Sequence, residues 1–181
     1  MTGQEAIDNL AAIAKIEINN DTLRCIAFNV IDNGFFAKGY GAAVGGTHAH
    51  HAYSGGLAVH TWEVTNIALA LIDNHSVKEI NADVLLTAAI CHDFCKIYDY
   101  DEAGNKTNYR NLVRHLSGSH AWFVNQAKDL NLPDGLRTQI EHCILAHHGR
   151  QEWGSPVEPQ TVEASILHYA DMLSMQYGVG R

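Results

Sequence analysis

The chain has 181 residues, of which 46% are hydrophobic and 18% charged, and this suits one compact domain with a sizeable core. The net charge is −8 with histidine neutral, and lysines and arginines are scattered, so we expect no surface that binds long nucleic acids unaided. No apolar stretch approaches the ~18 residues of a membrane span, and the N-terminus lacks the basic and apolar regions of a signal peptide. We therefore expect a single cytoplasmic domain over residues 1–181, with no membrane partner.

The four cysteines predict neither a disulfide nor a cysteine-ligated zinc ion. None of them forms a CxxC pair, and Cys91 and Cys95 stand at i and i+4 inside an apolar stretch. Buried reduced thiols are typical of such positions.

Helical spacing of apolar residues begins near the N-terminus. Gln4 to Ile18 follows this spacing, and Asn20 can cap a second helix that ends near Asp32. The segment Lys38 to Gly56 is rich in glycine and histidine, and we interpret it as a loop that leads into the centre of the molecule.

Two apolar helices in the middle of the chain carry polar side chains within their apolar faces. A helix from about Gly55 to Asn74 has His60 in its apolar stripe. The next begins near residue 77 or 81, runs to about residue 97, and contains His92 and Asp93 within LLTAAICHDFCK. Burying an isolated carboxylate is costly unless it is paired or bound to a metal, so this stretch requires a compensating partner.

Three further helices are expected in the second half of the chain. They cover Tyr109–Leu130, a segment that starts at Pro133 and ends at Gly149, and about Thr161–Tyr177. The polar stretch YDYDEAGNKTN and the irregular loop GRQEWGSPVEP separate them. Strand-like alternation is absent from the sequence, which predicts an all-α fold of roughly six to eight helices.

Seven polar residues lie on or next to the buried stripes of five predicted helices: His60, His92, Asp93, His115, His147, His148 and Asp171. Any one of them could be a core residue with its own hydrogen-bond partner, but seven would each need a separate partner. A shared metal centre satisfies them together. Mixed imidazole and carboxylate ligands suit Mn, Fe, Co, Ni or Zn better than Mg or Ca, and the set exceeds the needs of one ion. Two ions about 3.5–4 Å apart, bridged by Asp93, would use it fully.

The order His60, His92-Asp93, Asp171 resembles the H…HD…D pattern of the HD-domain metal-dependent phosphohydrolases. Longer strings carry a closer resemblance to the HD domain of bacterial YhaM-type 3′→5′ exoribonucleases: HHAYSGGLAVHT, AAICHDFCKI, HCILAHHGRQEWGSPVEPQT and LHYADMLSM. The similarity extends from about residue 16 to residue 175. It implies a single helical HD domain, divalent metal ions and cleavage of phosphodiesters.

The resemblance also implies roles for individual residues. His60, His92, Asp93 and Asp171 match the primary metal-binding positions, and His147-His148 match the paired histidines of a second ion. His115 fits the remaining second-site position better than His120. Lys96 matches the lysine of HDxxK, where it neutralises charge on a phosphate, although a surface lysine would also fit. His50 and His51 match the HHAY string, as phosphate contacts or as parts of a structural loop.

The expected mechanism is hydrolysis by a hydroxide that bridges the two metal ions, with Asp93 and Lys96 as the catalytic residues. The YhaM-type enzymes carry an OB-type domain ahead of the HD domain, whereas this sequence begins close to the HD region. The expected substrate is therefore a phosphate-ester small molecule, a nucleotide or a short oligonucleotide. The alternatives are a di-iron oxygenase of the HD type and a non-catalytic module that binds nucleotide or RNA. The sequence leaves the oligomeric state open, a homo-oligomer included.

Overall fold

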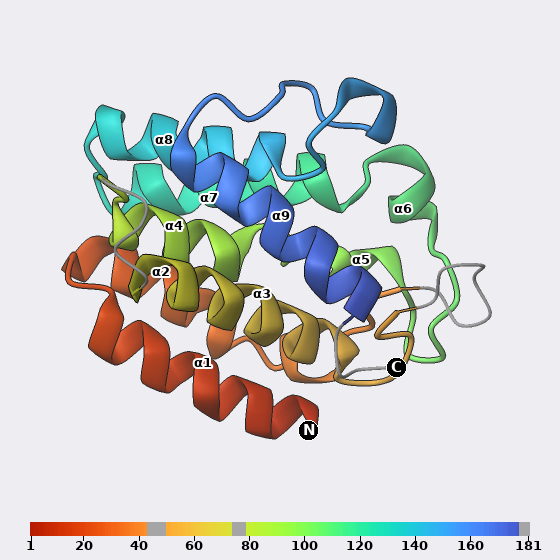
Figure 1. Ribbon diagram of the computed structural model, residues 1–181. Helices are drawn as coiled ribbons and strands as arrows, with labels where there is room; N and C mark the ends of the chain where they lie inside the picture. The colour runs from red at the N-terminus through yellow and green to blue at the C-terminus, as the bar shows by residue number, and fades with distance from the viewer. Residues whose placement is uncertain (43–49, 74–78, 178–181) are drawn as a thin grey trace.

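The computed structural model describes residues 1–42, 50–73 and 79–177, and over these residues it confirms the predicted all-α fold (Figure 1). Seven helices of ten or more residues and two shorter ones follow one another along the chain: α1 Gly3–Glu17, α2 Asp21–Ile31, α3 Gly56–Asp73, α4 Ala82–Cys91, α5 Lys96–Asp99, α6 Asn108–Leu112, α7 His115–Asp129, α8 Asp134–Ala146 and α9 Val162–Tyr177. Within the described ranges the extended backbone pairs only at an isolated bridge between Tyr100 and Lys106. None of the described helices is long and apolar enough to cross a membrane.

Two parts of the sequence prediction fall partly outside these ranges. Residues 43–49 of the predicted loop and residue 74, the predicted end of the third helix, are not among the described residues.

Side chains next to the helices fix where several of them begin. The Asn20 side chain accepts a hydrogen bond from Leu23 N at 3.0 Å, and Asn81 accepts one from Val84 N at 3.2 Å. Both are N-cap contacts, which satisfy amide groups that a helix leaves free at its start. Asp83 in the first turn of α4 accepts from the backbone amides of Asn19 and Asn20, so the start of α4 is also tied to the turn before α2.

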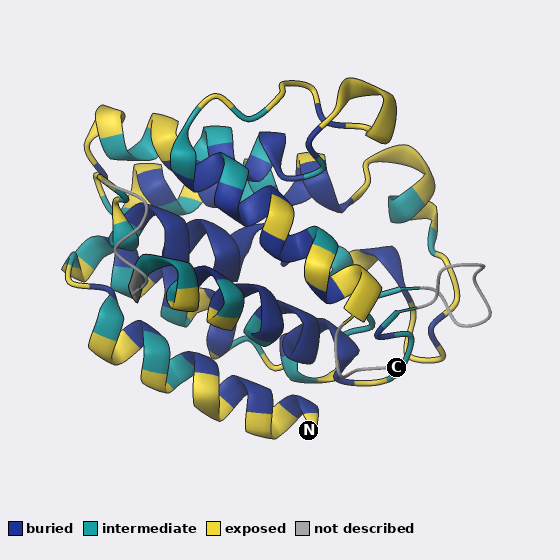
Figure 2. Ribbon diagram, in the orientation of Figure 1, coloured by how far each residue is buried: buried dark blue, intermediate teal, exposed yellow. Residues whose placement is uncertain are grey.

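Helix α4 is the centre of the fold (Figures 1 and 2). Every residue from Val84 to Cys91 is buried, and α4 packs against α1, α2, α3, α8 and α9. A helix that is apolar on all sides can only be stable when other helices cover it. Because His92 and Asp93 follow its last residue directly, they lie at the centre of the molecule.

The helix that carries His92 and Asp93 ends earlier than the sequence suggests. Periodicity predicts a helix to about Ile97, whereas α4 ends at Cys91 and the chain turns before α5 begins at Lys96. His92 closes this end itself, since its Nδ1 lies 2.7 Å from the carbonyl oxygen of Ala89. That carbonyl is one of those a helix leaves without a partner at its C-terminus.

The predicted helix over Tyr109–Leu130 is broken in two. Arg114 has a φ of 66° between α6 and α7, and the amides of Val113 and Arg114 both donate to the carbonyl of Tyr109. A positive φ is uncommon for a residue other than glycine and cannot be part of a right-handed helix. Consequently α7 begins at His115, which places that histidine at the start of a helix and not in its middle.

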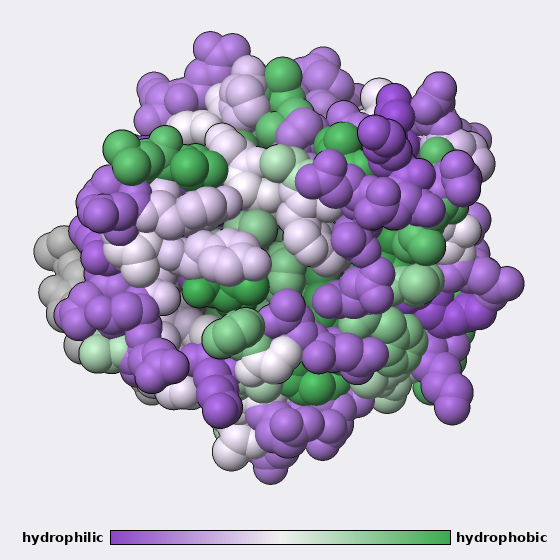
Figure 3. Space-filling model, turned by 180° about the vertical axis from the view of Figure 1, so that it is seen from behind, coloured by the Kyte–Doolittle hydropathy of each residue, from purple (hydrophilic) through white to green (hydrophobic). Residues whose placement is uncertain are grey.

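The surface is of mixed polarity. On the face opposite to that of Figure 1, hydrophilic side chains cover much of the area and hydrophobic residues appear in separate groups between them (Figure 3). The arrangement is common for a folded domain, because apolar atoms form more than half of most protein surfaces.

Candidate metal centre

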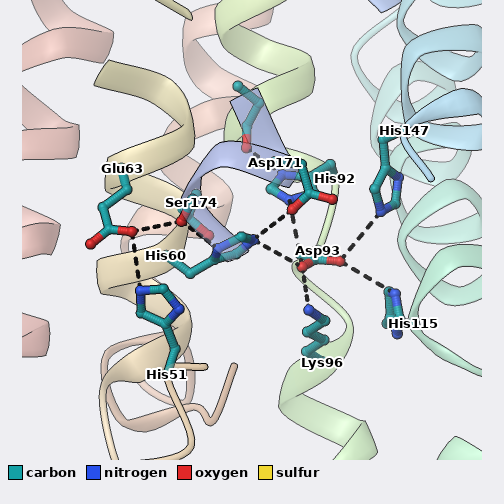
Figure 4. A network of polar contacts seen from close by, with 12 residues as sticks. His51, His60, Glu63, His92, Asp93, Lys96, His115, His147, Asp171 and Ser174 are labelled. Carbon is teal, nitrogen blue, oxygen red and sulfur yellow. Dashed lines mark hydrogen bonds and ion pairs between the residues drawn. The ribbon is translucent and has the colours of Figure 1, made fainter. Parts of the chain in front are cut away.

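Asp93 lies in the middle of a group of buried imidazoles (Figure 4). Its Oδ2 is 3.4 Å from His60 Nε2 and 3.5 Å from His92 Nε2. Its Oδ1 points the other way, 3.4 Å from His115 Nε2 and 3.6 Å from His147 Nε2. The two oxygens of one carboxylate therefore face two separate sets of nitrogen atoms.

The first set is enclosed by the core, and we call it the inner group: His60 on α3, His92 and Asp93 after α4, and Asp171 on α9. All four are buried, and one ligand atom from each lies within 4.8 Å of the others. Asp171 Oδ1 is 3.1 Å from His60 Nε2 and 3.9 Å from His92 Nε2. Two carboxylates and two imidazoles thus converge from three different helices.

The second set, the outer group, consists of His115, His147 and His148, again with ligand atoms within 4.8 Å of one another. The Nε2 atoms of His115 and His148 are 3.3 Å apart. This is about the separation of two nitrogens that bind one ion at about 2.0–2.1 Å in tetrahedral geometry. With Asp93 Oδ1 facing it, the outer group also offers four ligand atoms.

The other ring nitrogen of each of four histidines is held by a hydrogen-bond partner. Nδ1 of His92 and of His147 lies 2.7 Å and 2.6 Å from the carbonyl oxygens of Ala89 and Ile144, each three residues earlier. Nδ1 of His60 is 2.9 Å from Ser174 Oγ, and that of His115 is 2.9 Å from Asp99 Oδ2. Such partners fix the ring orientation and leave Nε2 free for a ligand, as in most metal-binding histidines.

Several of the free atoms are buried and have no hydrogen-bond partner among the described residues. They are Nε2 of His60, His92 and His147 and Oδ1 of Asp93. Buried polar atoms are rarely left unsatisfied in folded proteins. A divalent cation fits them, because neutral imidazole and carboxylate are the ligands that transition metals take.

The electrostatics of the site keep both carboxylates ionised. Burial raises the pKa of Asp93, but the charges of Lys96, His92 and His115 outweigh it and hold that pKa well below its usual value. Burial likewise raises the pKa of Asp171, but the imidazole of His60 beside it outweighs this effect and lowers that pKa below its usual value. Both groups are therefore available as negatively charged ligands at neutral pH.

The pKa values of the histidines in the site shift in opposite directions. Burial lowers the pKa of His60, but the carboxylates of Asp171 and Asp93, 3.1 Å and 3.4 Å from its Nε2, raise it to about 9. In the outer group, burial and the neighbouring His147 and His115 lower the pKa of His148 to about 3. Burial lowers the pKa of His147 too, but Asp93 and Asp171 outweigh it and raise that pKa above its usual value. His60 and His147 thus favour the protonated form, whereas His148 stays neutral.

Lys96 connects the centre to the surface. Its Nζ is 2.6 Å from Asp93 Oδ2, and its side chain lines a cavity of about 360 Å³ that Asp93, His115, His148 and Asp171 also line. Burial lowers the pKa of Lys96, but Asp93 and Asp171 raise it above its usual value, so the ammonium group keeps its charge.

Three supporting residues were not singled out as site residues by the sequence. Asp99 is fully buried and lies 2.9 Å from His115 Nδ1, although the polar residues around it in the sequence are typical of an exposed turn. Ser174 donates to Glu63 at 2.6 Å and contacts His60 (Figure 4). Of the three, the sequence indicates only Ser174, because helical spacing places it on the same face as Asp171.

The predicted phosphate contacts belong to neither group of ligand atoms, although the His51 ring lies 5.2 Å from the His60 ring. His51 is buried, and its Nε2 is 3.1 Å from Glu63 Oε2, while His50 is half-buried in the same turn. Their contact with phosphate stays a prediction. His120 does not join the outer group, since it faces Glu141 at 3.3 Å. Nδ1 of His168 on α9 lies 2.8 Å from the carbonyl oxygen of His147.

Comparison with known proteins gives a consistent result. Residues 57–176 match the HD domain. The chain is 35% identical over 130 residues to the 3'-5' exoribonuclease YhaM of Bacillus subtilis (strain 168), which is 70% of this chain and 40% of that protein. The enzyme of the same name from Listeria welshimeri is 32% identical over 126 residues, 68% of this chain and 40% of the relative. The chain thus matches about two fifths of the length of these curated relatives. No solved structure gives a significant match.

Proposed function

The chain belongs to the HD domain family, and from this we propose that it is a metal-dependent phosphohydrolase that cleaves a phosphodiester or a phosphate ester of a nucleotide or short RNA. The observation that carries the proposal is Asp93, whose two oxygens face the inner and the outer group. A carboxylate in this position can bridge two ions.

The inner group, His60, His92, Asp93 and Asp171, would hold one divalent ion, and the outer group with Asp93 would hold a second. Mn, Fe, Co, Ni and Zn all suit these ligands. When bound, such a pair lowers the pKa of a water and withdraws charge from phosphoryl oxygens. The residues of the chain fix the ligand atoms by hydrogen bonds, and one side of the centre borders a cavity.

Lys96 is the second catalytic residue in this proposal. It is charged, it contacts Asp93, and it lines the cavity beside the ligand atoms. A cation fixed at this boundary stabilises the negative charge that develops on a phosphoryl group during attack. His50 and His51, which the sequence suggested for the same purpose, lie in the turn before α3 and are proposed only as further contacts.

The class of substrate follows from the relatives, which are named as exoribonucleases. Because the chain matches only 40% of their length, the proposal is limited to nucleotides and short oligonucleotides. The cavity of about 360 Å³ is within the usual range for a small-molecule site.

The experiment is a metal analysis by mass spectrometry together with hydrolysis of bis(p-nitrophenyl) phosphate in Mn²⁺. We expect about two transition-metal ions per chain and turnover. Asp93→Ala should lose both, whereas Asp129→Asn, which removes an exposed carboxylate at the end of α7, should lose neither.

The other outcomes are equally informative. Protein that takes up no metal on reconstitution would contradict the metal centre itself. Bound metal without turnover of any phosphate ester would favour a binding module. Two irons with oxygen consumption and no hydrolysis would favour an oxygenase.

A further inference from the structure

A second recess lies beside the outer group. It has a volume of about 390 Å³, and its lining includes three basic residues, Lys106, Arg110 and Arg114, but no acidic residue among those described. The whole chain has 20 acidic and 12 basic residues, so this local excess of positive charge is opposite to that of the protein. Such a concentration of cations attracts an anionic ligand.

The recess adjoins the cavity at the metal centre. Arg110, His115, His148 and Trp153 line both of them. A ligand whose phosphate is bound beside Asp93 therefore has the recess directly next to it, on the far side of these four residues.

One of the three cations is held in a fixed position. Arg110 Nη1 is 3.1 Å from Asp99 Oδ2, and its guanidinium lies over the Tyr100 ring, 5.2 Å from the ring centroid. Asp99 also contacts His115. The guanidinium of Arg110 is thereby fixed relative to a predicted metal ligand, and a phosphate bound to Arg110 would be fixed as well.

The other two cations have uncompensated charges. Lys106 and Arg114 are exposed, and neither forms an ion pair with any described residue. Arg114 occupies the break between α6 and α7, so its side chain starts directly beside His115. Both cations can therefore bind an anion without first breaking an ion pair within this part of the protein.

Trp153 provides a different kind of contact. Its side chain lines both cavities and is 49% exposed, and the Arg150 guanidinium lies 4.9 Å from its ring centroid. An exposed aromatic ring between cations is typical of sites that bind single-stranded nucleic acid, where bases stack on rings and phosphates contact cations.

We propose that the recess formed by Lys106, Arg110, Arg114 and Trp153 is a subsite for the nucleotide next to the cleaved phosphate of a single-stranded oligonucleotide. The cations bind the neighbouring phosphate, and a base stacks on Trp153. This inference rests on the proposed function and narrows it, because the preferred substrate then has at least two phosphodiester bonds.

The test is calorimetric binding of phosphorothioate-linked diadenylate and triadenylate, checked to remain intact, in Mn²⁺ and at several salt concentrations. The two ligands carry one and two phosphodiester links. Wild-type protein should bind the longer ligand more tightly. Arg114→Ala and Lys106→Ala should reduce this gain, and each should lower the slope of log Kd against log salt by about 0.7, the value for one phosphate contact on a single strand.

Two further variants separate the charge effect from stacking and from general loss of charge. Trp153→Ala should weaken triadenylate binding by about tenfold and change the salt slope little, because stacking releases no counterions. Lys128→Ala removes one exposed positive charge at the other end of α7, about 20 Å from Arg114 at 1.5 Å per residue, and should alter neither quantity.

The outcomes distinguish the subsite from the proposed function. If Arg114→Ala and Lys106→Ala bind triadenylate with the affinity and salt slope of Lys128→Ala, the subsite is wrong even where diesters are hydrolysed. If the wild-type protein hydrolyses no phosphodiester, the proposed function fails, and the binding comparison still decides the subsite. Equal thermal midpoints of all variants would show that the substitutions leave the fold intact.

Discussion

The two sides of Asp93 use similar ligand atoms in different surroundings. The inner group lies between α3, α4 and α9 with His92 fully buried, and it borders the cavity of about 360 Å³ through Asp93 and Asp171. In the outer group His147 is also fully buried, but His115 and His148 line both cavities. One carboxylate therefore connects a more deeply buried group of ligand atoms with a group that borders two cavities.

The hydrogen bonds behind the ligands differ in the same way. Nδ1 of His60 contacts Ser174, which donates to Glu63, and both of these residues are buried. Nδ1 of His115 contacts Asp99, which also accepts a hydrogen bond from Arg110 at the edge of the recess. We infer that an ion in the inner group would contribute mainly to the stability of the fold, and that an ion in the outer group would exchange more readily and respond to substrate.

The largest effect is expected from Asp93→Asn, which keeps the size of the side chain and removes the charge shared by both groups. Metal content should fall from about two ions per chain towards none, and turnover should fall below detection. The half-buried charge of Lys96 also loses its partner, and because breaking a fully buried pair costs about 3–5 kcal/mol, we expect a smaller loss of stability here. Mass spectrometry and thermal denaturation measure the two losses. A variant that keeps both ions would show that Asp93 does not bridge them.

A smaller and more selective effect is expected from a pair of variants, His92→Ala and His148→Ala. His148→Ala should keep about one tightly bound ion and regain part of its turnover in excess Mn²⁺, because the inner group is complete. His92→Ala should lose the inner ion and destabilise the core; a loss of about 2 kcal/mol would lower Tm by about 4–8 °C. Metal content and Tm of both proteins check this. Equal metal loss in the two variants would remove the distinction between the groups.

Much of this arrangement could be predicted from the sequence. A helix that must be covered on all sides is visible as a run of apolar residues, and this places the end of α4 at the centre. A histidine such as His60 that interrupts an apolar stripe needs a buried partner, and the structure brings His60 beside Asp93 and Asp171. The polar residues within apolar helical stripes therefore indicate which side chains come together in the core, although not the distances between them.

Other features could not be predicted, because they depend on contacts between distant parts of the chain. Asp99 stands in a polar stretch that resembles an exposed turn, and only its contact with His115 and Arg110 explains why it is buried. The break at Arg114 has no glycine or proline to indicate it. Glu63 and Ser174 are 111 residues apart and meet only after α3 and α9 pack together.

Asp99→Asn tests the link between the outer group and the recess. Its amide cannot supply the charge that fixes His115 and Arg110, so the outer ion should bind about 10–100-fold more weakly while the inner ion is retained. A chelator competition assay on protein loaded with Mn²⁺ measures both ions. The control is Asp101→Asn, an exposed carboxylate two residues away that contacts only its own loop. If Asp99→Asn releases the inner ion first, the assignment of Asp99 to the outer side is wrong.

The smallest effect is expected from Ser174→Ala, on the inner side. The variant removes the contact with His60 Nδ1 and the hydrogen bond to Glu63, which keeps its contact with His51. Losing such a buried hydrogen bond costs about 1–3 kcal/mol, but His60 remains enclosed and close to Asp171, so the inner ion should be weakened by less than about tenfold.

Ser165→Ala is the matched control for this variant, since its hydroxyl bonds only to a carbonyl of its own segment. The same chelator competition and a thermal denaturation curve measure the difference between the two serine variants. If Ser174→Ala weakens metal binding as much as Asp99→Asn does, the core does not hold the inner ligands in place. Both ions would then depend equally on the hydrogen bonds behind their histidines.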